Sequence, residues 1–265
     1  MEISLILGIL VGMVLGLTGA GGGILAVPAL IAGMGWSMQQ ASPVALIAVA
    51  CGAVAAALDA WKKRLICIKE AVFISVVAIP FSALGVRLAH ILPQHILKGI
   101  FALVLLFVGL RTLKKHLIAI WKNRTLSKTQ QQTEPSGSKE ETAPSMVASG
   151  VIGVIAGLLS GLLGVGGGFI IVPMLQKFSN LPAQKIVATS LMVIALISAS
   201  SVINALLFGV ILPIKETVAF VLAVVTGVLI GRKLIVLCNE KMIQLIFSLL
   251  LVFVATSMII SLVRI

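Results

Sequence analysis

The chain contains the same glycine-rich phrase twice. Residues 16–30 read GLTGAGGGILAVPAL and residues 161–175 read GLLGVGGGFIIVPML, and nine of the fifteen positions are identical at a constant offset of 145. Further matches lie at or next to this offset, for example at 68–70 and 214–216, which both read IKE. The similarity extends over nearly the whole chain, so the protein is predicted to be two copies of one unit.

The composition places both copies in a membrane. Sixty per cent of the residues are hydrophobic, 11% are charged, and the mean hydropathy is +1.20. A soluble domain has about 25% charged residues, so the chain is predicted to be an all-α, multi-pass membrane protein. The net charge of +12 does not indicate nucleic-acid binding, because most Lys and Arg residues flank apolar runs or lie in the central linker.

Two of the apolar blocks are longer than one membrane crossing requires. The first and fifth blocks exceed 30 residues, whereas about 20 suffice to span a bilayer. Each contains a glycine cluster followed by a proline, Pro28 or Pro173, and both features disfavour a continuous helix. We therefore expect a broken helix at each GxGGG motif, with helix breaks at Pro28 and Pro173. The eight blocks cover about 3–35, 43–60, 66–92, 96–113, 146–176, 186–209, 214–237 and 242–263.

The apolar blocks are divided by one polar segment. Residues 122–145 are rich in Ser, Thr, Gln and Pro and contain very few apolar residues, which is typical of a flexible, exposed connection. The expected organisation is a transmembrane repeat at 1–113, a cytoplasmic linker at 114–145 and a second transmembrane repeat at 146–265.

Two topologies follow from the blocks. If each long block crosses once, there are eight crossings, the halves are parallel, and the Lys and Arg residues divide 13 to 7 between the two sides. If each long block crosses twice, there are ten crossings, five per half, the halves are inverted, and the division is 16 to 4. Because positive residues collect on the cytoplasmic side, the charges favour the inverted arrangement. The short second arm at 24–36 argues the other way, since it is too short for a full span.

The glycine clusters are the candidate substrate site. Non-helical backbone at membrane depth is tolerated where it is buried in protein or lines a cavity. An unwound glycine turn that leads into a helix presents N–H groups and the positive end of the helix dipole, which together favour an anion. The alternative is close helix packing, to which we assign the glycines upstream of the clusters. The cluster residues are Gly19, Gly21, Gly22 and Gly23 in the first repeat and Gly164, Gly166, Gly167 and Gly168 in the second.

Hydroxyl and ionisable side chains are the next candidates. Ser42 and the pair Thr189 and Ser190 each begin an apolar block after a glycine unit, where they cap a helix or donate to an anion. Asp59 and Asn204 occupy matching positions near the ends of their blocks. Asp59 stands close to a run of basic residues, so a surface ion pair is favoured over a role in ion coupling.

Arg87 and Lys233 also match across the two copies. They are candidates for the positive charge that an anion requires, or for side chains that extend to the membrane interface. Motifs of hydrolases and metalloenzymes are absent from the sequence, so we expect neither an enzyme nor a cofactor nor a metal site.

The doubled phrase, with Ala41-Ser42, Ala188-Thr189-Ser190, GVRL at 85–88 and GRKL at 231–234, resembles the TauE/SafE sulfite exporter family. The resemblance covers residues 1–113 and 146–265. It implies a permease of the bacterial or archaeal cytoplasmic membrane for small anions such as sulfite or organosulfonates. The first copy differs from the second at one point: Ser42 is followed by Pro43, whereas the second copy has the hydroxyl pair Thr189 and Ser190. The expected function is secondary transport by alternating access. Proton or sodium coupling and the oligomeric state stay open, and an anion channel or a non-transporting scaffold is the alternative.

Overall fold

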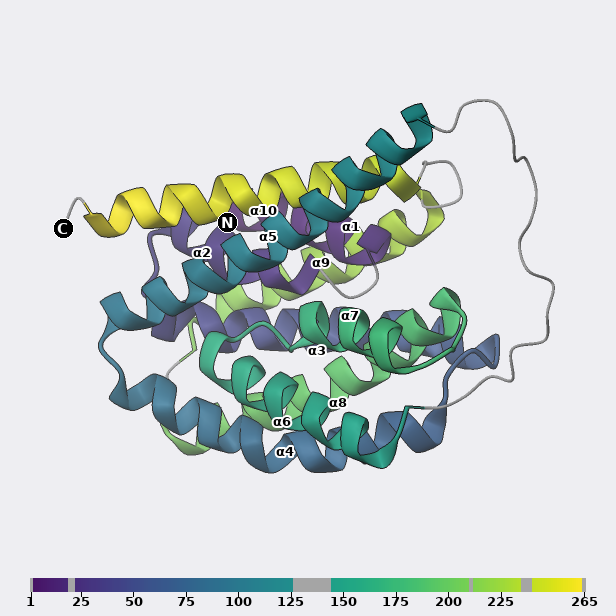
Figure 1. Cartoon of the computed structure of the whole chain (residues 1–265). Coiled ribbons are helices and arrows are strands. Elements are labelled where there is room, and N and C mark those ends of the chain that lie inside the picture. Colours follow the sequence, from purple (N-terminus) through teal and green to yellow (C-terminus); the bar gives the residue numbers. More distant parts are fainter. Residues whose placement is uncertain (1, 19–21, 126–143, 210–211, 235–239, 264–265) are drawn as a thin grey trace.

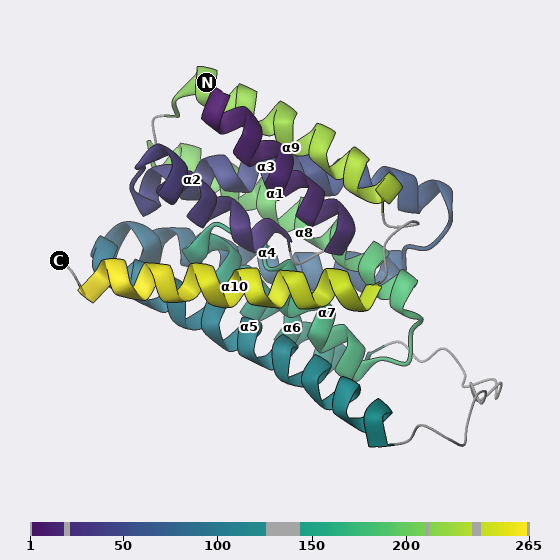
Figure 2. The same ribbon diagram turned by 90° about the horizontal axis from the view of Figure 1, so that it is seen from above.

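The computed structural model describes residues 2–18, 22–125, 144–209, 212–234 and 240–263, and all its regular elements in those ranges are helical. The helices lie side by side along one common direction (Figures 1 and 2). In chain order they are α1 (Glu2–Thr18), the 3-10 helix η1 (Gly22–Leu25), α2 (Ala26–Met34), α3 (Met38–Lys62), α4 (Ile68–Ile91), α5 (Gln94–Thr125), α6 (Met146–Leu163), α7 (Gly168–Phe178), α8 (Ala183–Leu207), α9 (Ile214–Leu234) and α10 (Glu240–Val263).

Six of the described helices are long and apolar enough to cross a membrane, namely α3, α4, the 94–114 part of α5, α6, α8 and α9. The short helices α2 and α7 have 9 and 11 residues. At 1.5 Å per residue they measure about 14 and 17 Å, roughly half of a hydrocarbon core of about 30 Å. Large apolar side chains such as Phe107 and Phe253 are exposed on the outside of the bundle, as a lipid-facing surface requires. The protein is therefore an all-helical, multi-pass membrane protein.

Each of the expected blocks corresponds to one or two helices. The two long blocks are α1 with η1 and α2, and α6 with α7, while the other six are single helices. α3 and α8 are both 25 residues long and contact each other in the middle of the bundle, where they are the most buried of the spanning helices. α5 packs against α10 along one side of the molecule (Figure 2).

The two halves of the chain do not form separate bundles, because helices of one half pack mainly on helices of the other. α1 packs mainly on α9 of the second half, and α6 packs mainly on α4 of the first half. In both contacts, the glycines predicted to serve packing bring the helix backbones together. A Cβ atom on any of them would overlap a backbone carbonyl of the partner helix. The contacts are Gly8, Gly12 and Gly16 with the carbonyls of Phe220, Val224 and Val228, and Gly153, Gly157 and Gly161 with those of Ile74, Ala78 and Ser82.

The helical part of the first half extends further than expected. α5 continues to Thr125, whereas the linker was predicted to begin at residue 114. The sequence between residues 110 and 134 contains neither Gly nor Pro, so nothing in it stops a helix until the polar segment is reached. Of the rest of the predicted linker, residues 126–143 lie outside the described ranges.

Candidate functional site

The second glycine cluster forms a non-helical turn between α6 and α7. α6 ends at Leu163, and α7 begins at Gly168. Three of the intervening residues have left-handed backbone conformations, with φ of 74° at Gly164, 76° at Gly166 and 71° at Gly167. Residues other than glycine rarely adopt this conformation, which explains why three glycines are needed within four positions. The predicted broken helix of the second repeat is therefore present.

The helix breaks lie at the glycines, whereas Pro28 and Pro173, which we expected to break their helices, do not. Pro173 is inside α7 and Pro28 is the third residue of α2. The first turn of a helix tolerates proline because its N–H groups have no partner within the helix, which accounts for Pro28. In α7 the proline removes one hydrogen bond without interrupting the helix.

In the first repeat the turn differs. α1 ends at Thr18, and helical structure resumes with η1 at Gly22, so Gly22 and Gly23 are in a 3-10 helix that leads into α2. Gly19 and Gly21 lie outside the described residues. A Cβ on Gly22 would overlap the backbone of Leu15, so this glycine allows η1 to pack on α1 of its own repeat.

The two glycine regions meet in the middle of the bundle. A Cβ on Gly23 would lie 3.1 Å from the carbonyl oxygen of Val165 and 3.1 Å from a methyl group of Val49. A Cβ on Gly166 would lie 3.0 Å from the other methyl group of Val49 and 3.0 Å from Ile194. Val49 and Ile194 are each the twelfth residue of a 25-residue helix, α3 and α8. The glycine regions therefore face each other half-way along the central helices.

The second turn offers unused hydrogen-bond donors. In the part of the chain that the structure describes, the backbone N–H groups of Val165, Gly166 and Gly167 have no acceptor, whereas the N–H of Gly164 donates to the carbonyl of Ser160 at 2.9 Å. All four residues are buried. Adjacent N–H groups at the start of a helix form an anion-binding arrangement.

The structure places only one of the three predicted hydroxyl residues at the glycines. Ser42 is 9% exposed and lies so close to Gly164 that a Cβ on the glycine would overlap it. Thr189 instead accepts a hydrogen bond from the backbone N–H of Cys67 at 3.1 Å. Ser190 donates to the carbonyl of Val187 at 2.8 Å within its own helix.

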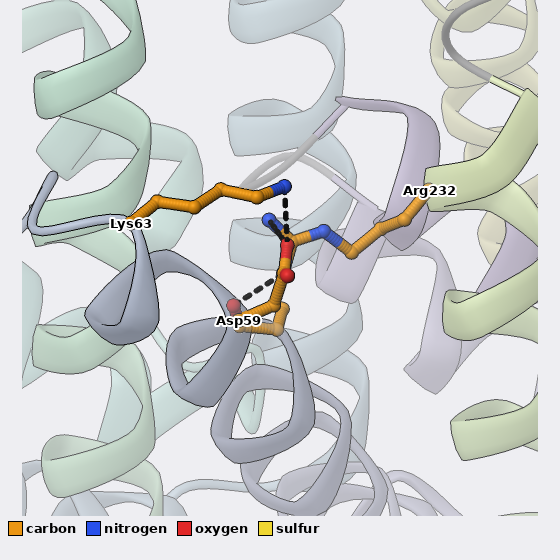
Figure 3. Close-up of polar contacts among 4 residues, drawn as sticks. Asp59, Lys63 and Arg232 are labelled. Carbon is orange, nitrogen blue, oxygen red and sulfur yellow. Dashed lines mark hydrogen bonds and ion pairs between the residues drawn. The ribbon is translucent and has the colours of Figure 1, made fainter.

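Asp59 takes part in a charged cluster at the end of α3, as Figure 3 shows. Its Oδ2 is 3.1 Å from Nζ of Lys63 and 3.1 Å from Nη2 of Arg232 on α9. Arg232 also donates to the carbonyl of Ala56. The preferred interpretation of Asp59 as a surface ion pair is confirmed. Its counterpart Asn204 donates to the carbonyl of Ser200 at 2.8 Å within α8.

The predicted cations lie toward opposite ends of the bundle. The guanidinium of Arg87 lies 5.8 Å from the centre of the Phe208 ring, just after the end of α8. Lys233 is exposed near the end of α9, beside Arg232. In the second copy the residue that forms the ion pair is thus Arg232, the neighbour of the predicted Lys233.

Sequence reasoning missed two buried serines next to the second turn. Ser160 is in the last turn of α6, and Ser198 is on α8 with its hydroxyl 2.7 Å from the place where a Cβ on Gly166 would be. At the repeat offset of 145, the first copy has Leu15 and Ala53 in their places. Polar residues in one copy opposite apolar residues in the other were a signal that could have identified them.

A family model described as sulfite exporter TauE/SafE matches residues 4–258. The chain belongs to the TauE/SafE family. Curated relatives span bacteria and archaea, and each is named a probable membrane transporter protein. YjnA of Bacillus subtilis is 26% identical over 94% of this chain and 96% of its own length. A Xylella fastidiosa relative is 28% identical over 74% and 70%, and MJ0441 of Methanocaldococcus jannaschii is 27% identical over 77% and 72%. No solved structure matches the chain.

The TauE/SafE protein also has an apolar groove of about 540 Å³ between α1, α2, α5 and α10. Its lining includes Val14, Leu25 and Pro28, and its polar side chains are those of Lys98 and Ser257. So apolar a lining suits hydrocarbon better than a small anion, and we do not assign the substrate to it.

Neutralising Asp59 tests its role in this TauE/SafE protein. Its side chain is 45% exposed, so solvent weakens its ion pairs and Asp59→Asn should lower the free energy of unfolding by no more than about 1 kcal/mol. Transport should stay at the wild-type level. Thermal unfolding in detergent and vesicle uptake measure the two effects. A folded variant that has lost transport would instead make Asp59 a coupling residue.

Proposed function

We propose that the protein is a secondary transporter that moves a small anion, sulfite or an organosulfonate, across the bacterial or archaeal cytoplasmic membrane by alternating access. The observation that carries this proposal is the meeting of two glycine regions half-way along α3 and α8, with unused backbone N–H groups in the second turn. Broken helices that present N–H groups at the membrane midplane are typical of anion sites in transporters.

In this proposal the two repeats are inverted and form ten membrane-inserted segments. Each half has five helices, and we infer that the chain reverses direction from each helix to the next. An odd number of segments per half gives the second copy the opposite orientation. The basic residues at 62–64, Lys177 and Lys233 then share the linker's side, where charge bias places the cytoplasm. The short helices α2 and α7 are re-entrant segments that cross only part of the membrane.

The chemical roles follow from these positions. The N–H groups of Val165, Gly166 and Gly167 bind the anion, and Gly22, Gly23 and Ser42 complete the wall of the site. Thr189 holds α8 next to the start of α4 by accepting the N–H of Cys67, and Ser190 satisfies its hydroxyl within α8. The positive charges near opposite ends of the bundle, Arg87 and Lys233, attract the anion toward each entrance.

Alternating access in this proposal is a change in how the two halves pack. The α1–α9 and α4–α6 contacts join different halves through glycines at four-residue spacing, where the helix backbones touch directly. Such contacts permit the small sliding motions of packed helices that open one entrance and close the other. Proton or sodium coupling can supply the driving force.

Uptake into proteoliposomes tests the function. Purified protein is reconstituted, and entry of radiolabelled sulfite, sulfate, thiosulfate and a sulfonate is followed with and without a pH gradient. We expect one of these anions to enter faster than into protein-free vesicles and to accumulate above its equilibrium level when a gradient is imposed. Entry that stops at equilibrium under every gradient would identify an anion channel. No entry of any of the four anions would reject the proposed transport of sulfur anions.

A further inference from the structure

Ser160 and Ser198 stand out among the buried hydroxyl residues. Both are 0% exposed, and neither hydroxyl oxygen has a hydrogen-bond partner in the described part of the protein. A third such hydroxyl, that of Thr217, lies in the first turn of α9, at the end of the bundle. A buried polar group without a partner is unfavourable, and more so at membrane depth where water is absent.

Other buried serines on the helices of the bundle show how a partner is normally found. Ser201 donates to the carbonyl of Ile197 at 2.9 Å, and Ser75 donates to that of Ala71 at 2.7 Å. A serine on a helix satisfies its hydroxyl in this way simply by choosing a rotamer. The hydroxyls of Ser160 and Ser198 are directed elsewhere.

Both unused hydroxyls lie at the second glycine turn. The Ser198 oxygen is directed at Gly166, and Ser160 precedes Gly164 by one helical turn, with its carbonyl accepting the N–H of Gly164. The N–H groups of Val165, Gly166 and Gly167 in the same turn are also unused. A group of free donors in a buried place fits an acceptor with several oxygens, as an oxyanion has.

At the positions that correspond to Ser160 and Ser198, the first copy has no hydroxyl side chain. The residues at the repeat offset are Leu15 and Ala53, and Leu15 packs against Gly22 of the first glycine region. The two copies therefore differ in chemistry although their helices correspond.

We propose that Ser160 and Ser198 donate hydrogen bonds to the transported oxyanion, and that the anion is held asymmetrically, on the second glycine turn, with Ser42 and apolar residues of the first repeat completing the wall. This inference rests on the proposed function and adds the residues that contact the substrate.

The test compares Ser198→Ala and Ser160→Ala with the control Ser201→Ala. All three remove a buried hydroxyl from the same region, but only that of Ser201 is satisfied within its helix. A hydrogen bond to a charged group is strong, so each test variant should raise the KM of anion uptake by about tenfold or more. Ser201→Ala should leave KM unchanged, and Ser198→Thr, which keeps a hydroxyl, should restore part of the affinity.

Equilibrium binding separates this inference from the transport proposal. The anion carried by the wild type should raise the thermal unfolding temperature of the detergent-solubilised protein, and this rise should be smaller in Ser198→Ala and Ser160→Ala than in Ser201→Ala. Equal rises and equal KM values in all three variants would overturn the inference and leave the transporter intact. A wild-type protein that neither binds nor transports any of the four anions would overturn both.

Discussion

Replacing Gly157 with alanine should lower the free energy of unfolding by about 1–3 kcal/mol, the usual cost of overpacking a tight contact. The added methyl group would overlap the carbonyl of Ala78, and the atoms in conflict belong to two helix backbones, which cannot yield as a flexible side chain does. α6 would have to move away from α4, along the contact that joins the two halves. Gly12→Ala should have a similar effect, because Gly12 meets the carbonyl of Val224 in the equivalent α1–α9 contact.

Gly150→Ala is the matched control. Gly150 lies on α6, two turns before Gly157, and a Cβ there would have nothing within 4 Å. Alanine favours the helix over glycine by roughly 0.5–1 kcal/mol, so this change should be neutral or stabilising. Thermal unfolding in detergent measures all three variants. Equal stability of Gly157→Ala and Gly150→Ala would show that the close contact between α6 and α4 contributes nothing to the fold.

Much of the fold could be predicted from the sequence because its signals are local. The length of the apolar runs indicates the membrane helices. The cluster of glycines, which adopt left-handed conformations, indicates the break between α6 and α7. The glycines at four-residue spacing, such as Gly8 and Gly12, indicated helix packing, and the structure confirms it. Periodicity does not name the partner, however. That α1 contacts α9 and α6 contacts α4 follows from the three-dimensional packing of both halves together.

The candidate site was harder to predict because a hydroxyl's role depends on what lies beside it. Thr189 and Ser190 begin an apolar block in the sequence. In the structure, however, the Thr189 hydroxyl accepts a backbone N–H and the Ser190 hydroxyl donates to a backbone carbonyl. Ser198, in the middle of an apolar helix, has no local signal except its difference from Ala53. Pro28 misled for a related reason: a proline in the first turn of a helix breaks nothing. Pro173 lies further inside α7 and does not interrupt it either.

Changing Gly166 to alanine should stop transport while the protein still inserts and folds. Gly166 has a φ of 76°, which an L-residue adopts at a cost of roughly 1–2 kcal/mol. The new methyl group would also lie 2.7 Å from the hydroxyl of Ser198 and 3.0 Å from Val49, in the space where the unused donors converge. It would therefore distort the turn and at the same time occupy the place that we propose for the anion. We expect the uptake rate to fall at least about tenfold, since 1.4 kcal/mol corresponds to a factor of ten.

The control Gly35→Ala separates backbone strain from occupation of the site. Gly35 has a φ of 68° at the end of α2, but a Cβ there has nothing within 4 Å. It should therefore reproduce the cost of the left-handed conformation alone, with a small loss of stability and normal uptake. If both variants lose transport equally, backbone strain at these two turns is enough to explain the defect, and crowding at Gly166 is not needed. If only Gly166→Ala loses transport, and its unfolding temperature is close to that of Gly35→Ala, the loss comes from crowding where the two glycine regions meet. The cost of the left-handed conformation cannot explain it, because both variants share that cost.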